Sequence, residues 1–179
     1  MGPRGTRHAG AVAFVAAFVA LIAACGGPAN GGVGTSHEPR EAEPLELALR
    51  TTEGSFIEVG AMGGRPVVLF FFATFDALSQ AATRPLARFA RLHGADVHVV
   101  AVAVQPDAAA LAGAWAGALG VAFTVAYEPE PRVLAGRTAL GTLAGVPTLV
   151  VLDAEGHIVA RHTGFASETK LERLLEHAR

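Results

Sequence analysis

Three residues bear most directly on what chemistry this chain can do: Cys25, Asp76 and Ser79. Cys25 is the only cysteine among the 179 residues, so the chain cannot form an internal disulfide. A cysteine thiolate is the nucleophile of disulfide exchange, and neither the carboxylate of Asp76 nor the hydroxyl of Ser79 can replace it in that reaction. What the chain can do therefore depends on where Cys25 lies and on what surrounds Asp76 and Ser79.

Residues 1–24 have the pattern of a secretory signal peptide. Arg4 and Arg7 are their only charged residues, and residues 9–24 are apolar or small, which gives a basic start, an apolar stretch and a small-residue exit. An apolar stretch of about 16 residues is shorter than the ~20 that a membrane span needs. The run Ile22-Ala23-Ala24-Cys25 resembles the bacterial lipobox, which implies a lipid on Cys25; ordinary cleavage nearby and an uncleaved anchor are the alternatives.

The chain that follows the signal has the size of one domain and a weakly acidic balance. Residues 25–179 hold all sixteen acidic residues but only twelve of the fourteen Lys and Arg, for a net charge near −4. Nucleic-acid partners need clustered basic surface, so this balance argues against them. Residues 25–44 are rich in Gly, Pro and charge and predict a flexible tether with an end-to-end distance of roughly 25 Å.

These features predict a lipid-anchored protein of the cell envelope. The partner of the N-terminus would be the membrane itself, with an envelope protein or peptide as a possible further partner. In lipoproteins, Gly26 rather than Asp after the cysteine implies no retention at an inner membrane, and hence an outer-membrane or periplasmic location if the source has two membranes.

From residue 45 onward the sequence alternates between strand and helix patterns. Leu45, Leu47 and Leu49 have period-two spacing and predict, with residues 56–59, an N-terminal hairpin. The six-residue apolar run at 67–72 predicts a central strand buried on both faces. Further strands are expected at 97–104, 123–126, 148–152 and 157–162, and helices at 77–93, 106–119, 129–138 and 167–177. This order predicts an α/β fold with a mixed sheet and helices on both faces.

Two helix patterns predict particular packing. Residues 77–93 place Leu78, Ala82, Leu86, Phe89 and Leu92 at helical spacing, with Pro85 inside the helix. In the next helix, Leu111, Trp115 and Leu119 follow at four-residue steps, and we expect this stripe to belong to the core rather than to a cofactor site.

Two segments resemble the thioredoxin-like superfamily. Residues 71–75, FFATF, precede a helix with an internal proline, as in the FWATWCxxC…P stretch of the TlpA/ResA and AhpC-TSA (redoxin) proteins. Residues 143–149 resemble the GVPT segment of that group, and residues 152–164 its acidic-Gly hairpin. The likeness spans residues 45–179 and implies a thioredoxin-like fold with a cis Val146–Pro147 bond. It also implies a groove for an extended substrate chain, formed by Phe75, Asp76, Ser79, Val146, Pro147 and Thr148.

The likeness fails at the two redox positions. Aligning residues 73–75 with the family pattern places Asp76 at the attacking cysteine and Ser79 at the resolving one. Aligning on Pro85 instead moves the second position to Gln80, with the four-residue step of Sco-like copper carriers. Neither alignment supplies a thiol, so disulfide exchange and thiol-based peroxidase chemistry both lack their nucleophile.

Asp76 has two interpretations on this pattern. It is a good N-cap for the helix that follows, because its side chain can accept hydrogen bonds from first-turn amides. Alternatively Asp76, Ser79 and Thr148 face a small molecule or peptide at the mouth of the former redox site. A nucleophilic serine would need a neighbouring base, and no histidine is near Ser79 in the sequence.

The histidines match no metal motif. His98, His157 and His162 have no metal-ligand spacing and no cysteine to join them, so we expect strand-edge or surface positions, with no metal and no cofactor. A Sco-like role in metal delivery is disfavoured, because Cu(I) prefers sulfur ligands.

Two functional hypotheses remain. The first is an envelope lipoprotein with a thioredoxin fold and no redox cysteines, which acts as a binding or scaffold module. The second is the thiol-disulfide oxidoreductase or peroxidase that the family likeness implies, working through a non-standard site or with a partner's cysteines.

Overall fold

The computed structural model describes residues 43–179, and every structural statement below concerns these residues. The predicted signal peptide, the lipidation of Cys25 and most of the tether lie outside the described residues. No helix within residues 43–179 is both long and apolar enough to cross a membrane.

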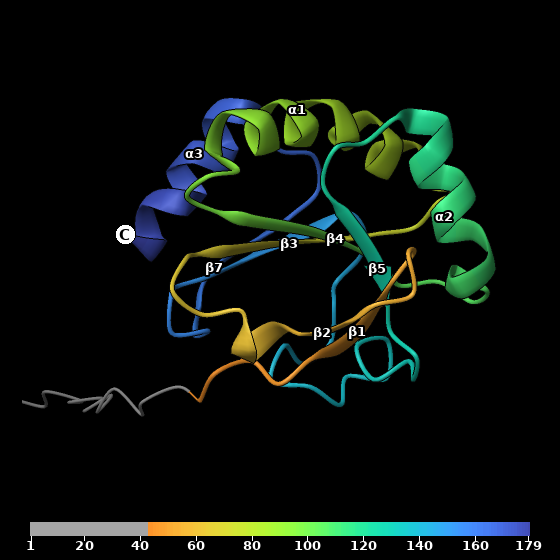
Figure 1. Cartoon of the computed structure of the whole chain (residues 1–179), viewed down its shortest axis with the longest axis horizontal. Helices are drawn as coiled ribbons and strands as arrows, with labels where there is room; N and C mark the ends of the chain where they lie inside the picture. Colours follow the sequence, from red (N-terminus) through yellow and green to blue (C-terminus); the bar gives the residue numbers. More distant parts are fainter. Residues whose placement is uncertain (1–42) are drawn as a thin grey trace, which may run out of the picture. The chain divides into compact units, whose positions relative to one another are not determined.

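The described chain folds as a seven-stranded mixed sheet with helices packed against it (Figure 1). Its strand order is β2-β1-β5-β4-β3-β6-β7. β3 and β4 run parallel, as do β4 and β5, and the other pairs are antiparallel. The elements are β1 Ala48–Thr51, β2 Phe56–Glu58, the 3-10 turn η1 Val59–Ala61, β3 Val67–Phe72, α1 Ala77–His93, β4 His98–Ala103, α2 Ala108–Leu119, β5 Thr124–Tyr127, β6 Thr148–Leu152, β7 Ile158–Thr163, α3 Glu168–Leu175 and the 3-10 turn η2 Glu176–Ala178.

β3 lies at the centre of two apolar cores. All six of its residues are buried, because β4 and β6 flank it and both faces are covered. Val68, Phe70 and Phe72 point into the core beneath the helices, and the alternate residues point into the core on the opposite face. The continuous apolar run in the sequence was therefore a sound indication of a central strand.

The three α-helices share one face of the sheet. Residues of α1, α2 and α3 all contribute to the same core, and the ring of Trp115 packs 4.2 Å from that of Phe72. The opposite face is covered by the N-terminal hairpin, η1 and the long connection between β5 and β6, with Leu47, Val59, Val133 and Leu140 buried there. The predicted mixed sheet with helices is confirmed, but the expectation of α-helices on both faces is met on one face only.

The helix predicted at residues 129–138 is wrong, since this segment consists of turns. Pro129 and Pro131 cannot donate backbone hydrogen bonds, and Gly136 has a positive φ of 64° that ends any helical path. The carboxylate of Glu128 accepts a hydrogen bond from the Val133 amide, whose nitrogen lies 3.2 Å from Oε1 and 3.0 Å from Oε2. That amide is consequently unavailable for a helical hydrogen bond.

Several leucines that were expected in the core are exposed instead. Leu111 and Leu119 are each 44% exposed, so only Trp115 of the predicted α2 stripe is buried. Ala108 and Ala112 form the rest of the buried face of α2. In α1, Leu78 and Leu92 are likewise exposed, whereas the other apolar residues of its pattern are buried.

Candidate functional site

The turn before β6 and the N-terminus of α1 meet at one end of the sheet. β3 ends at Phe72 and leads directly into the loop before α1, while β6 begins at Thr148. The antiparallel register pairs Phe71 with Thr148, so the residues after Phe72 and those before Thr148 leave the sheet side by side. This register brings together the two segments that the sequence had indicated.

Asp76 caps α1 as one of the two interpretations predicted. Its backbone is extended, and Oδ2 accepts a hydrogen bond from the Ser79 amide at 2.6 Å. Its carbonyl also accepts from the Gln80 amide at 3.1 Å. Because α1 has no other acidic residue, Asp76 alone supplies a negative charge at the positive end of this helix.

Ser79 is buried and cannot meet a ligand through its side chain. It is 0% exposed, and its hydroxyl has no hydrogen-bond partner within the described residues. The Ser79 carbonyl accepts from the Thr83 hydroxyl at 3.0 Å. The expectation that Ser79 faces a ligand at the site mouth is therefore wrong, because the first turn of α1 directs this residue into the protein.

Gln80, the alternative second position, has the opposite environment. It is exposed, and its side-chain amide donates to the carbonyl of Thr74 at 3.0 Å. Of the two candidates, Ser79 is the residue that the first turn of α1 buries. None of these contacts brings Ser79 or Gln80 next to a base that could activate a nucleophile.

The turn at Val146–Pro147 is held by its neighbours on β7. The bond between these residues is cis, as the family likeness implied. The Pro147 carbonyl accepts from the Gly164 amide at 2.8 Å. The Thr148 hydroxyl donates to the Gly145 carbonyl at 2.7 Å and lies 3.0 Å from that of Thr163. Thr148 is thus buried and engaged internally, so the expectation that its side chain faces a ligand is also wrong.

Two exposed aromatic residues lie in the segments that flank this turn. Phe75, one residue before the α1 cap, is 76% exposed, and Phe165 is 47% exposed. Phe165 follows Gly164, whose amide binds Pro147, and this places it next to the turn. Phe165 was not predicted from the sequence, although an aromatic residue directly after Gly164, the last residue of the predicted hairpin segment, was available as a signal.

Gln105 is a second residue that the sequence analysis missed. It is buried, and its side-chain oxygen accepts a hydrogen bond from the Thr74 amide. Gln105 follows the end of β4, and Thr74 follows the end of β3. The bond therefore fixes the loop that presents Phe75 and Asp76, and its only sequence signal is a polar residue at the end of a buried strand.

The histidines occupy the sheet edges and ends, as expected, and stand apart from one another. His98 begins β4, His162 lies in β7, and His157 precedes β7. Within residues 43–179, no three His, Cys, Asp or Glu side chains come together as a metal ion would require. His157 instead pairs with Asp153 at 3.2 Å. Partial burial acts to raise the pKa of Asp153, but hydrogen bonds from His157 outweigh it and lower that pKa.

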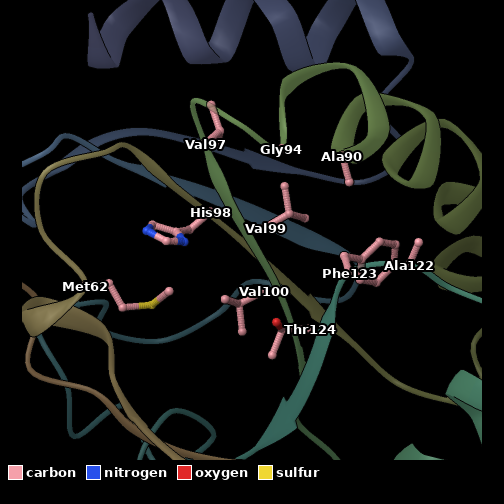
Figure 2. Close-up of a pocket in the computed structure, with 10 residues that line it drawn as sticks. All are labelled: Met62, Ala90, Gly94, Val97, His98, Val99, Val100, Ala122, Phe123 and Thr124. Carbon is pink, nitrogen blue, oxygen red and sulfur yellow. The ribbon is translucent and has the colours of Figure 1, made fainter.

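His98 borders a hollow of about 200 Å³ at the start of β4. Figure 2 shows His98 and Met62 at one end of this hollow and Ala122 and Phe123 at the other. The Arg65 guanidinium lies 3.0 Å from Nε2 of His98 and donates to the Ala95 carbonyl at 2.8 Å. Burial and the neighbouring Arg65 charge both lower the pKa of His98. The hollow lies at the opposite end of β4 from Gln105, and so apart from the α1 cap.

Comparison with known proteins decides the family. A family model described as Redoxin matches residues 39–175. The chain belongs to the redoxin family. No curated protein matches it.

Solved structures show the same fold for this redoxin. A thiol:disulfide interchange protein from Chlorobium tepidum is 19% identical with a TM-score of 0.63, covering 76% of this chain and 94% of that one. StoA from Bacillus subtilis is 17% identical, with a TM-score of 0.61 and coverage of 74% and 98%. The exposed lipoprotein thioredoxin of Streptococcus pneumoniae is 22% identical, with a TM-score of 0.62 and coverage of 73% and 98%. At these identities the likeness establishes the thioredoxin-like fold.

The cap and the buried hydroxyl predict opposite effects of two small substitutions. Asp76→Ala removes the acceptor of the Ser79 amide and should lower the free energy of unfolding by about 1 kcal/mol. Ser79→Ala removes a buried hydroxyl without a partner, and such a group costs about 1–3 kcal/mol, so this variant should be as stable as the natural protein or more so. Urea unfolding of the full-length protein measures both.

Asp76→Asn is the control and should stay close to the natural stability, since Asn also caps helices. A loss of stability as large as that of Asp76→Ala would contradict the capping role of Asp76.

His98 predicts a pH dependence of stability. Its folded pKa lies below its ordinary value of 6.5, so the unfolded chain binds this proton more readily, and stability falls as the pH drops below that value. His98→Gln keeps an acceptor for Arg65 but cannot titrate. Urea unfolding at pH values on either side of 6.5 should show a smaller loss on acidification for the variant than for the natural protein. An identical loss in both would show that His98 does not contribute.

Proposed function

We propose that this redoxin-family protein is a thiol-free binding module, lipid-anchored in the cell envelope, that holds extended polypeptide segments at the Val146–Pro147 turn. One observation carries the proposal: the two positions aligned with the redox cysteines hold a helix-capping carboxylate, Asp76, and a buried hydroxyl, Ser79. Asp76 has a structural role as the cap of α1, Ser79 is buried without a hydrogen-bond partner for its hydroxyl, and neither side chain can carry out disulfide exchange.

The lack of a second cysteine supports a role without redox turnover by the chain itself. Disulfide exchange requires a thiolate that attacks a sulfur and a second thiol that resolves the mixed disulfide. Residues 43–179 contain no cysteine, and the only cysteine of the chain is Cys25. Peroxide reduction through a sulfenic acid needs a thiolate as well. A lipid on Cys25 would remove that last thiol from both reactions.

The turn beside α1 retains what a peptide would need. Val146 is half-buried, and its amide and carbonyl have no backbone hydrogen-bond partner among residues 43–179. An extended segment can add to such an unpaired edge through main-chain hydrogen bonds, with side chains seated in neighbouring pockets. Phe75 and Phe165 supply exposed aromatic surface at this edge, which favours segments with apolar side chains.

The proposed location rests on the sequence before the domain. A signal-like segment ends at Cys25, and one solved relative is described as an exposed lipoprotein. Two or more acyl chains on one cysteine give stable membrane attachment, whereas one gives only weak binding. A domain on the tether would therefore work close to a membrane surface.

A second candidate is an oxidoreductase that works with a partner's cysteines. Family membership favours it, because the redoxin match covers residues 39–175 and a solved neighbour is described as a thiol:disulfide interchange protein. In this case the partner would supply both sulfur atoms, and the present chain would only orient them.

Restoring the two cysteines tests the premise that both candidates share, namely that the natural chain has no redox activity of its own. We expect full-length natural protein in detergent to give no dithiol-driven insulin reduction above the buffer rate. Asp76→Cys/Ser79→Cys should gain activity, because it places a thiolate at the α1 N-terminus, where the helix dipole lowers a thiol pKa. Ser79→Cys alone is the matched control and should stay inactive, since its single thiol would be buried and position 76 would still hold a carboxylate instead of an attacking thiol. Natural protein that matched the double variant would contradict the proposal.

A further inference from the structure

A groove runs between the exposed side of α1 and the end of α2. It encloses about 710 Å³, and Arg84, Arg88 and Arg91 of α1 line it together with Leu119 and Val121 at the end of α2. It begins one turn beyond Asp76, at Gln80, and it is separate from the Val146–Pro147 turn. Nothing in the proposed function uses these arginines.

The groove carries a positive charge that its own surroundings leave largely unbalanced. α1 has three arginines and no acidic residue, and α2 has no charged residue at all. Arg88 pairs with Glu168 of α3 at 3.3 Å. Arg84 and Arg91 are exposed, and neither makes an ion pair within the described residues.

Internal stability accounts for only part of this cluster, since Arg88 pairs with Glu168 and Arg91 lies in the last turn of α1, where a positive charge suits the helix dipole. Like charges three or four residues apart on a helix face destabilise it by a few tenths of a kcal/mol per pair. The end of α2 does not need arginine caps either, because the Gly120 and Val121 amides already bind the Ala116 carbonyl. Within residues 43–179, no arginine of α1 donates a hydrogen bond to α2. Arg84 and Arg91 are therefore available to an outside partner.

The remaining lining indicates the chemistry of that partner. Leu119 is 44% exposed, and with Val121 and Ala87 it forms an apolar wall beside the arginines. A simple phosphate ion would gain nothing from such a wall, whereas a polypeptide with both carboxylates and apolar side chains would contact both parts. Arginine also suits carboxylates in particular, since its planar guanidinium binds them through two parallel hydrogen bonds.

We propose that the α1–α2 groove binds an acidic amphipathic segment of a partner protein. Arg84, Arg88 and Arg91 follow the helical spacing i, i+4, i+7, which spans about 10 Å along the axis. A partner helix with carboxylates at the same spacing would pair with Arg84 and Arg91 and would compete with Glu168 for Arg88, with its apolar residues on the Leu119 side. The inference is independent of the peptide site at Val146.

The test is fluorescence anisotropy with a labelled helical peptide that carries Glu at i, i+4 and i+7 and Leu beside them. Full-length protein should bind it, and Arg84→Gln/Arg91→Gln should weaken binding by about tenfold or more, in line with the loss of two charge-assisted contacts. Arg173→Gln/Arg179→Gln removes the same charge from exposed sites outside the groove and should bind as the natural protein does. An isomeric peptide with the same Glu residues spread around the helix should bind more weakly than the matched one.

A charge swap provides the second measurement. Arg84→Glu/Arg91→Glu should reject the acidic peptide and bind a version in which Lys replaces Glu. The proposal is overturned if the acidic peptide fails to bind, if both Gln variants weaken it equally, or if the isomers bind alike. It is also overturned if inorganic triphosphate or phosphatidylglycerol vesicles displace the peptide from the groove and bind there more tightly, since the site would then recognise phosphate.

Discussion

The hydrogen bond from the Ser79 amide to the Asp76 carboxylate is the interaction on which the site depends. It starts α1 directly after the central strand, and it places a fixed negative charge where the family pattern puts a reactive sulfur. A carboxylate that caps a helix stabilises the first turn but offers no route to a covalent sulfur intermediate. The same contact therefore stabilises the start of α1 at a position where the family likeness implies a cysteine.

The sheet determines what this cap faces. Pairing of Phe71 with Thr148 brings the cis Val146–Pro147 turn next to the start of α1, and Gln105 fixes the intervening loop through the Thr74 amide. These constraints come from three different strands. The backbone of Val146 consequently lies beside the start of α1, with no backbone hydrogen-bond partner among residues 43–179.

Local patterns were sufficient to predict the elements that build this edge. The apolar run at 67–72 and the Asp76 cap are encoded by neighbouring residues, and both agree with the structure. The burial of Ser79 and Thr148 was not predictable in this way, because it depends on which side of α1 and β6 meets the core. Similarly, Glu128 competes for the Val133 amide, a contact that propensity alone cannot show. Phe165 and Gln105 gain their roles only from strand pairing and were missed for that reason.

The function proposed for the Val146–Pro147 turn is the binding of extended polypeptide without thiol chemistry. Amide hydrogen exchange of the full-length natural protein tests it most directly, with and without insulin B chain whose cysteines are carboxymethylated, an extended polypeptide that cannot form a disulfide. We expect slower exchange at Val146 on addition of the peptide, together with slower exchange of the neighbouring amides around Asp76. Unchanged exchange at Val146, or protection confined to surfaces away from this turn, would contradict it.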